Sequence, residues 1–162
     1  MTTSRLLSLL AFALLVAATV PMTTPQVRAA GKPLVVVVSA SAAMKDISTA
    51  TLRRAFQGMA TDFEAGKRFI PLNHPPGTPT RTQFDRAVLG LEPDAVGAFW
   101  IDRRIRDESP PPRTVPTPEL ALRIVGSLLG AITYVFPELV TPAVKVLTID
   151  GKVAGQPGYL LK

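Results

Sequence analysis

The chain contains no cysteine at all. This absence excludes disulfide bonds, thiol catalysis and cysteine-ligated zinc sites. It also excludes a lipoprotein lipobox, whose acylated residue is a cysteine. A domain of this size needs no disulfide if it buries a core of its own.

Histidine is almost as scarce, because His74 is the only one in 162 residues. A multi-histidine metal site within one chain is therefore impossible, and any Ser-His-Asp triad depends on this one side chain. No G-x-S-x-G motif and no paired-carboxylate or calcium-loop spacing is present. We expect a protein that is not an enzyme and has no metal or cofactor. His74 is expected in a surface loop, and a hydrolase that uses it is a remote alternative.

Aromatic residues are few, and the net charge of +6 is modest. Within residues 31–162 the balance is 16 basic against 12 acidic residues, or +4. The basic residues are scattered apart from Arg103, Arg104 and Arg106, which we interpret as the solvated end of a helix. Nucleic-acid binding is therefore not favoured, whereas a mild preference for anions fits the charge.

Long apolar runs are also missing, with one exception near the start. Arg5 precedes an uncharged, mostly apolar run from Leu6 to Val20, and Val27 and Ala29 fit the −3 and −1 positions of a cleavage site. This pattern predicts a secretory signal peptide over residues 1–30 and a periplasmic or secreted domain over residues 31–162. The competing interpretation is a membrane anchor, for which the run is short. We expect contact with the membrane only through an uncleaved leader.

The rest of the chain alternates strand and helix patterns, which predicts a single α/β domain. Residues 34–38 form a valine-rich run of the kind found in strands buried on both faces, as in a parallel sheet. Strands are also expected at 69–72, 131–135 and 144–149. Helices are expected at 48–58, 80–89, 93–106 and 118–130, the third with Val96, Phe99, Trp100 and Ile101 facing inward.

The candidate ligand site lies between the strand at 69–72 and the helix that follows it. Gly77, Thr78, Thr80 and Arg81 would place hydroxyls and a cation at a helix N-terminus, where unpaired N–H groups favour anions. Ser39 and Ser41 end the first strand and are expected to face the same crevice. The alternative is an ordinary strand–helix turn, because Pro79 has no N–H to donate.

Residues 35–151 resemble phosphate ABC-transporter substrate-binding proteins, which have the type 2 periplasmic binding protein fold. The segments that carry the likeness are residues 35–39 (VVVVS), 52–58 (LRRAFQG), 69–84 (FIPLNHPPGTPTRTQF), 128–135 (LLGAITYV) and 144–151 (VKVLTIDG). The resemblance implies a single-lobe α/β domain with a mixed sheet flanked by helices. It also implies that the partners are phosphate or a related oxyanion and a transporter or another envelope protein.

The chain departs from the family in length and at the ligand loop. Family members have two lobes that close on phosphate, and this chain has about half their length. Thr78-Pro79-Thr80 stands where the family has Ser-Gly-Thr, and His74 stands where it has an arginine. The alternative function is therefore a non-catalytic envelope interaction protein with a degenerate ligand site.

Overall fold

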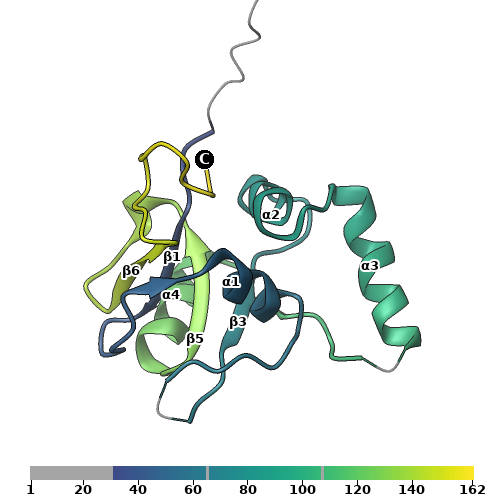
Figure 1. Ribbon diagram of the computed structural model, residues 1–162, viewed down its shortest axis with the longest axis horizontal. Coiled ribbons are helices and arrows are strands. Elements are labelled where there is room, and N and C mark those ends of the chain that lie inside the picture. Colours follow the sequence, from purple (N-terminus) through teal and green to yellow (C-terminus); the bar gives the residue numbers. More distant parts are fainter. Residues whose placement is uncertain (1–30, 65, 107) are drawn as a thin grey trace, which may run out of the picture.

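The computed structural model describes residues 31–64, 66–106 and 108–162. The predicted signal peptide, residues 1–30, lies outside them. No helix in the described ranges is long and apolar enough to cross a membrane. The elements (Figure 1) are β1 (Val35–Ser39), β2 (Asp46–Ile47), α1 (Thr49–Phe56), β3 (Ile70–Asn73), α2 (Pro79–Phe84), the π-helical turn η1 (Asp85–Leu89), α3 (Pro93–Ile105), β4 (Arg113–Thr114), α4 (Pro118–Ser127), β5 (Ala131–Val135), the 3₁₀ turn η2 (Pro137–Leu139) and β6 (Val144–Ile149).

The six strands form one mixed sheet in the order β2-β6-β1-β5-β3-β4. The valine-rich strand β1 lies near its middle and is antiparallel to both neighbours, β5 and β6. The predicted mixed α/β fold is confirmed. The expectation that β1 belongs to a parallel arrangement is wrong, because a run of valines reports burial on both faces and says nothing about the direction of the neighbouring strands.

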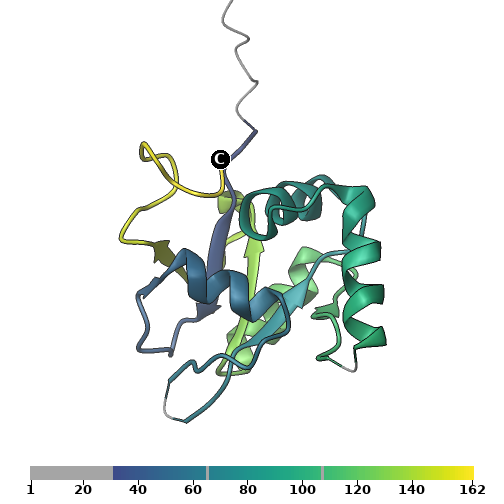
Figure 2. The ribbon, with the colours of Figure 1, turned by 45° about the vertical axis from the view of Figure 1, so that its right-hand side comes forward.

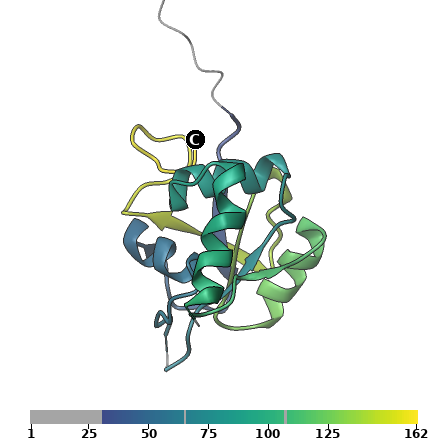
Figure 3. The ribbon, with the colours of Figure 1, turned by 90° about the vertical axis from the view of Figure 1, so that its right-hand side faces the viewer.

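Alternate valines of β1 build two separate cores. Val36 and Val38 pack on the side of α1 and the α2–η1 helix. Val35 and Val37 pack on the opposite side, against α4. Burying each of these side chains contributes roughly 1.5–3 kcal/mol relative to leaving it exposed. Figure 3 shows the resulting three layers, with α1 and α4 on opposite sides of the strands.

Local capping signals fix where the helices begin. The Ser48 side chain accepts a hydrogen bond from the Thr51 N–H at the start of α1, as predicted. Thr117 caps α4, and Pro118 occupies its first turn. Thr78, not Thr80, caps α2, so this helix begins at Pro79, one residue before the predicted start.

Helix α3 differs most from its predicted packing. Val96, Phe99 and Trp100 are only half-buried, and Ile101 is 62% exposed rather than inward-facing. Arg103, predicted to be solvated, is buried instead. Its guanidinium lies over the rings of Phe99 and Trp100 and pairs with Glu108 at 2.9 Å. Arg103 therefore belongs to the packed face of the helix, where its planar group stacks on aromatic rings.

The C-terminal segment returns to the start of β1. The Leu34 N–H donates to the Leu161 carbonyl at 3.0 Å, and the Tyr159 hydroxyl donates to the Leu34 carbonyl at 2.9 Å. Tyr159 and Leu161 are buried in the core on the α1 side. Figure 2 shows the C-terminus beside the first described residues. The tail thus completes the domain rather than extending from it.

Gly130 provides a test of the turn that joins α4 to β5. Its φ is +100°, and a Cβ built there would lie 2.8 Å from the Arg68 carbonyl oxygen. We expect Gly130→Ala to lower the free energy of unfolding by at least about 2 kcal/mol, because backbone strain adds to a clash with main chain. The matched control is Gly90→Ala, which has φ +69° and no neighbour within 4 Å. It should cost only about 1–2 kcal/mol. Urea unfolding measures both, and equal losses would contradict the clash.

Candidate functional site

The candidate ligand loop is a tight turn after β3. The Thr78 hydroxyl donates to the Pro75 carbonyl at 2.9 Å and accepts from the Arg81 N–H at 3.4 Å. The Thr78 N–H also donates to the Pro75 carbonyl, at 3.3 Å. Gly77, at φ +82°, allows the chain to reverse its direction between Pro75 and Thr78. The turn and the first turn of α2 are therefore held as one unit.

This turn presents backbone donors to solvent. The N–H groups of Gly77 and Thr80 have no acceptor among the residues that the structure describes. Gly77 is exposed and Thr80 is half-buried. Pro79, between them in the first turn of α2, contributes no donor. The turn thus contains two backbone N–H groups without an acceptor among the described residues.

Arg81 points into the protein rather than into the turn. Its Nε donates to Asp85 Oδ2 at 2.6 Å and its Nη1 donates to the His74 carbonyl at 3.1 Å. Arg81 is only 5% exposed, so it is not the open cation that the sequence analysis expected. Burial raises the pKa of Asp85, and the nearby Arg81 charge offsets part of this effect. The pair fixes α2 to the residue that precedes the turn.

His74 is buried, not on the surface as predicted. Its Nε2 lies 2.6 Å from the Tyr134 carbonyl oxygen, and its ring meets the Tyr134 ring edge-on. A carbonyl only accepts, so Nε2 carries the proton in this arrangement. Burial lowers the pKa of His74, which keeps the imidazole neutral. This position serves packing, and it gives no support to a hydrolase based on His74.

Tyr134 on β5 anchors the turn from the other side. Its ring stacks on Phe84 of α2 with centroids 3.7 Å apart, and its hydroxyl donates to the Asn73 side chain. Burial raises the pKa of this hydroxyl and keeps it protonated. Sequence reasoning missed Asn73, Asp85 and Tyr134 as supports of the turn. The Arg81–Asp85 spacing of four residues on a helix was the one signal available for this pair.

Ser39 and Ser41 do not face this turn, so the expected common crevice does not exist. Strands β1 and β3 both neighbour β5, but β1 is antiparallel and β3 parallel to it. Their carboxyl ends therefore point in opposite directions, and Ser39 lies three residues, roughly 10 Å, along the sheet from the level of Asn73. The Ser39 hydroxyl bonds instead to Ser41 Oγ at 2.9 Å and the Gly126 carbonyl at 3.3 Å.

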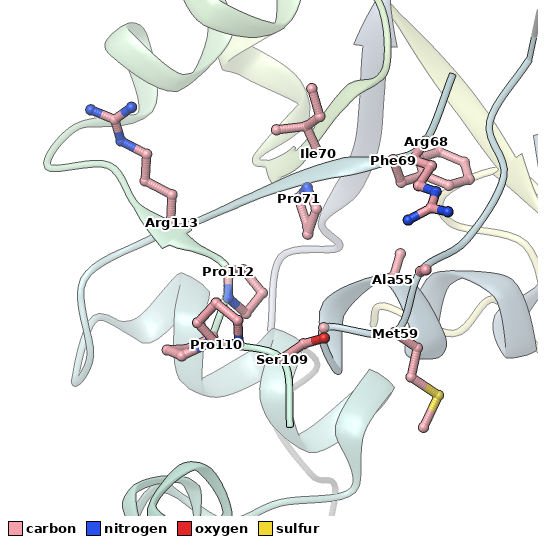
Figure 4. A pocket seen from close by; sticks show the side chains of 13 residues that line it. Ala55, Met59, Arg68, Phe69, Ile70, Pro71, Ser109, Pro110, Pro112 and Arg113 are labelled. Carbon is pink, nitrogen blue, oxygen red and sulfur yellow. The ribbon is translucent and has the colours of Figure 1, made fainter. Parts of the chain in front are cut away.

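The structure also contains a shallow, mainly apolar pocket of about 360 Å³. Figure 4 shows it between the start of β3, at Arg68 to Pro71, and the segment Ser109–Arg113. None of the predicted ligand residues lines it. No group of three or more metal-ligating side chains occurs among the described residues. The pocket is therefore separate from the candidate anion site.

Comparison with solved structures identifies the fold. A phosphate ABC transporter substrate-binding protein with bound phosphate from Clostridium perfringens matches with a TM-score of 0.60 and 15% identity, over 75% of this chain and 46% of that one. An ABC-type phosphate transport receptor from Vibrio cholerae matches with a TM-score of 0.61 and 14% identity, over 75% and 48%. PstS from Borrelia burgdorferi gives 0.58 and 9%, over 75% and 48%.

The chain has a mixed α/β fold that matches about half of each of these substrate-binding structures. The match confirms the resemblance inferred from the sequence for the fold. It does not extend to function, because the identities are low. The chain spans about half the length of the phosphate-binding structures that it matches. No family model matches the sequence, and no curated protein matches it.

The Arg81–Asp85 pair is testable by mutation. We expect Arg81→Met to lower the free energy of unfolding by about 3–5 kcal/mol, because it leaves the Asp85 carboxylate buried without a partner. Combining it with Asp85→Leu should recover most of the loss. The matched control is Arg86→Met, which breaks the exposed Arg86–Glu92 pair at a cost below about 1 kcal/mol. Chemical denaturation measures all three, and an Arg81→Met loss as small as the control's would contradict the buried pair.

His74 should make stability depend on pH. Its pKa in the folded state lies below the ordinary 6.5, so the unfolded chain takes up the proton more readily. Its contribution to stability is therefore present above about pH 6.5 and decreases as the pH falls through the folded pKa. His74→Gln keeps a donor for the Tyr134 carbonyl but does not titrate. Unfolding between pH 7.5 and 5 should show a slope smaller by up to about 1.4 kcal/mol per pH unit in the variant. Parallel curves would contradict this role.

Proposed function

We propose that this chain is an exported, non-catalytic solute-binding lobe that binds phosphate or a related oxyanion at the Gly77–Thr80 turn. The observation that carries the proposal is the pair of N–H donors without an acceptor at Gly77 and Thr80, in a turn that the buried Arg81 side chain holds in place through Asp85 and the His74 carbonyl. The fold, which matches that of phosphate-binding transport receptors, supports it. The leader-like residues 1–30 support export to the periplasm.

The geometry sets the expected strength of binding. Each hydrogen bond to a charged group contributes roughly 1.5–3 kcal/mol. Two N–H groups and one hydroxyl therefore supply enough for a dissociation constant near the millimolar range, which corresponds to about 4 kcal/mol. The turn is open to water, and the Arg81 charge is balanced by Asp85 rather than directed at the ligand. We infer weak binding by the isolated lobe, and partnership with an ABC-type phosphate transporter belongs to the same proposal.

The inward orientation of Arg81 also favours a second candidate function. In this case the chain is an envelope interaction protein in which the ligand site has degenerated. A lobe that retains the braced turn but binds no anion is what this candidate predicts. The two functions differ in whether phosphate contacts the turn.

Phosphate titration followed by ¹H–¹⁵N NMR distinguishes the two candidates. We expect the Gly77 and Thr80 amide signals to shift with an apparent dissociation constant of about 1 mM. Thr80→Val should weaken binding several-fold, because it removes the hydroxyl and keeps the side-chain shape. Thr82→Val on the same helix and Ser39→Ala at the opposite end of the sheet are the matched controls and should leave the affinity unchanged. Chloride at equal ionic strength corrects for general screening.

Two results would overturn the assignment of phosphate to the Gly77–Thr80 turn. One is the absence of residue-specific shifts at the turn up to tens of millimolar phosphate. The other is a set of shifts centred on Ser39 and Ser41 instead of Gly77 and Thr80. The first result favours the interaction protein, and the second moves the anion site to the other end of the sheet.

A further inference from the structure

Helix α3 lies at the flank of the molecule with one side turned away from it (Figures 1 and 3). Its inner side consists of Val96, Phe99, Trp100 and Arg103, which are half-buried or buried. These positions repeat every three or four residues, as expected for one face of a helix. The opposite face has no covering element among the described residues.

That uncovered face has the spacing of a helix-pairing seam. Asp94, Ala98, Ile101 and Ile105 follow one another at intervals of four, three and four residues, which places them in one line along the helix. All four are exposed, Ile101 by 62% and Ile105 by 79%. Ile101 and Ile105 thus form an exposed apolar patch along the free face of the helix.

The charges near the two ends of α3 favour one direction of pairing between two copies of the helix. Asp94 lies at the N-terminal end of α3 and Arg104 near the C-terminal end, and neither forms an ion pair within the described part of the chain. The neighbouring Asp102, Arg106 and Glu108 are engaged with one another or with Arg103. An antiparallel copy of α3 would bring each free carboxylate near a free guanidinium. A parallel copy would bring like charges together.

We propose that α3 forms an antiparallel homodimer interface with α3 of a second copy of this chain. Ile101 of one copy packs over the small Ala98 of the other, and each Ile105 lies beside the partner copy's N-terminal turn. The exposed methyl groups supply the apolar contact, and the Asp94–Arg104 attraction and the opposed helix dipoles set the direction. This inference is independent of the proposed anion site, which lies at the turn that leads into α2.

Sedimentation equilibrium of the purified protein tests whether it dimerises. We expect a monomer–dimer equilibrium in the micromolar range that Ile101→Glu weakens at least 100-fold. The matched control is Val153→Glu, which places the same charge on an exposed apolar residue outside α3 and should leave dimerisation unchanged. Circular dichroism of each variant checks that the fold is retained. A protein that stays monomeric up to several hundred micromolar, or a dimer that tolerates Ile101→Glu, would overturn the proposal.

Charge reversal tests the pairing of the ends. Asp94→Arg alone and Arg104→Glu alone should each weaken dimerisation about tenfold. The double variant should return to within about threefold of the original protein, because the attraction is restored with its sign exchanged. Additive losses in the double variant would contradict an Asp94–Arg104 contact between copies.

The absence of native cysteine allows a direct test of direction. One sample of the protein carries Asp94→Cys and another carries Ile105→Cys, and the two are mixed and oxidised. These positions are eleven residues apart, roughly 16 Å along a helix. The antiparallel dimer therefore gives the mixed disulfide and little of either homodimeric one. Predominance of the homodimeric products would indicate parallel pairing and overturn the proposed interface.

Discussion

Burial of β1 on both faces is the constraint on which the rest of this fold depends. Val36 and Val38 require a cover on one side and Val35 and Val37 on the other, which α1 with α2–η1 and α4 provide. The strand also needs partners along both edges, because buried backbone groups must be hydrogen-bonded. Both partners, β5 and β6, run antiparallel to it. These strand directions determine which loops lie at the same end of the sheet. Only loops at the same end can contribute to one site.

The predictions that succeeded rest on local chemistry. Ser48 as a helix cap, Gly58 after α1 and Pro118 at the start of α4 follow from backbone geometry that a few neighbouring residues determine. The relation between β1 and β3 is different, since it depends on β5, about 60 residues beyond β3. No local pattern encodes it. The expected meeting of Ser39 with Thr78 was wrong for this reason, although Ser39 ends β1 and Thr78 follows β3.

The directions of several side chains were the second feature that the sequence did not predict. A histidine next to prolines and a glycine is typical of a surface loop, yet His74 is buried because the Tyr134 carbonyl and ring lie beside it. Arg81 follows a Gly/Thr turn, which suggests an anion ligand, yet Asp85 one helical turn later draws it inward. In α3 the packed positions Val96, Phe99, Trp100 and Arg103 leave Ile101 on the other side. Local sequence therefore placed these residues on their elements, and contacts with distant residues determined which way their side chains point.

The Gly77–Thr80 turn is held in a fixed position and has no cation directed toward it, and both properties come from the same contacts. Arg81 and Tyr134 hold the turn and its preceding residues in place, so its N–H groups need little reorganisation to meet a ligand. The same contacts engage the Arg81 guanidinium, and Asp85 balances its charge. What remains for an anion is a set of oriented backbone dipoles in contact with water, where their attraction is screened. Tight binding would require a second surface that excludes water from the turn, because desolvation strengthens every hydrogen bond to a bound oxyanion. The proposed oxyanion site is therefore open to water, and it lacks the enclosure that gives such a site high affinity.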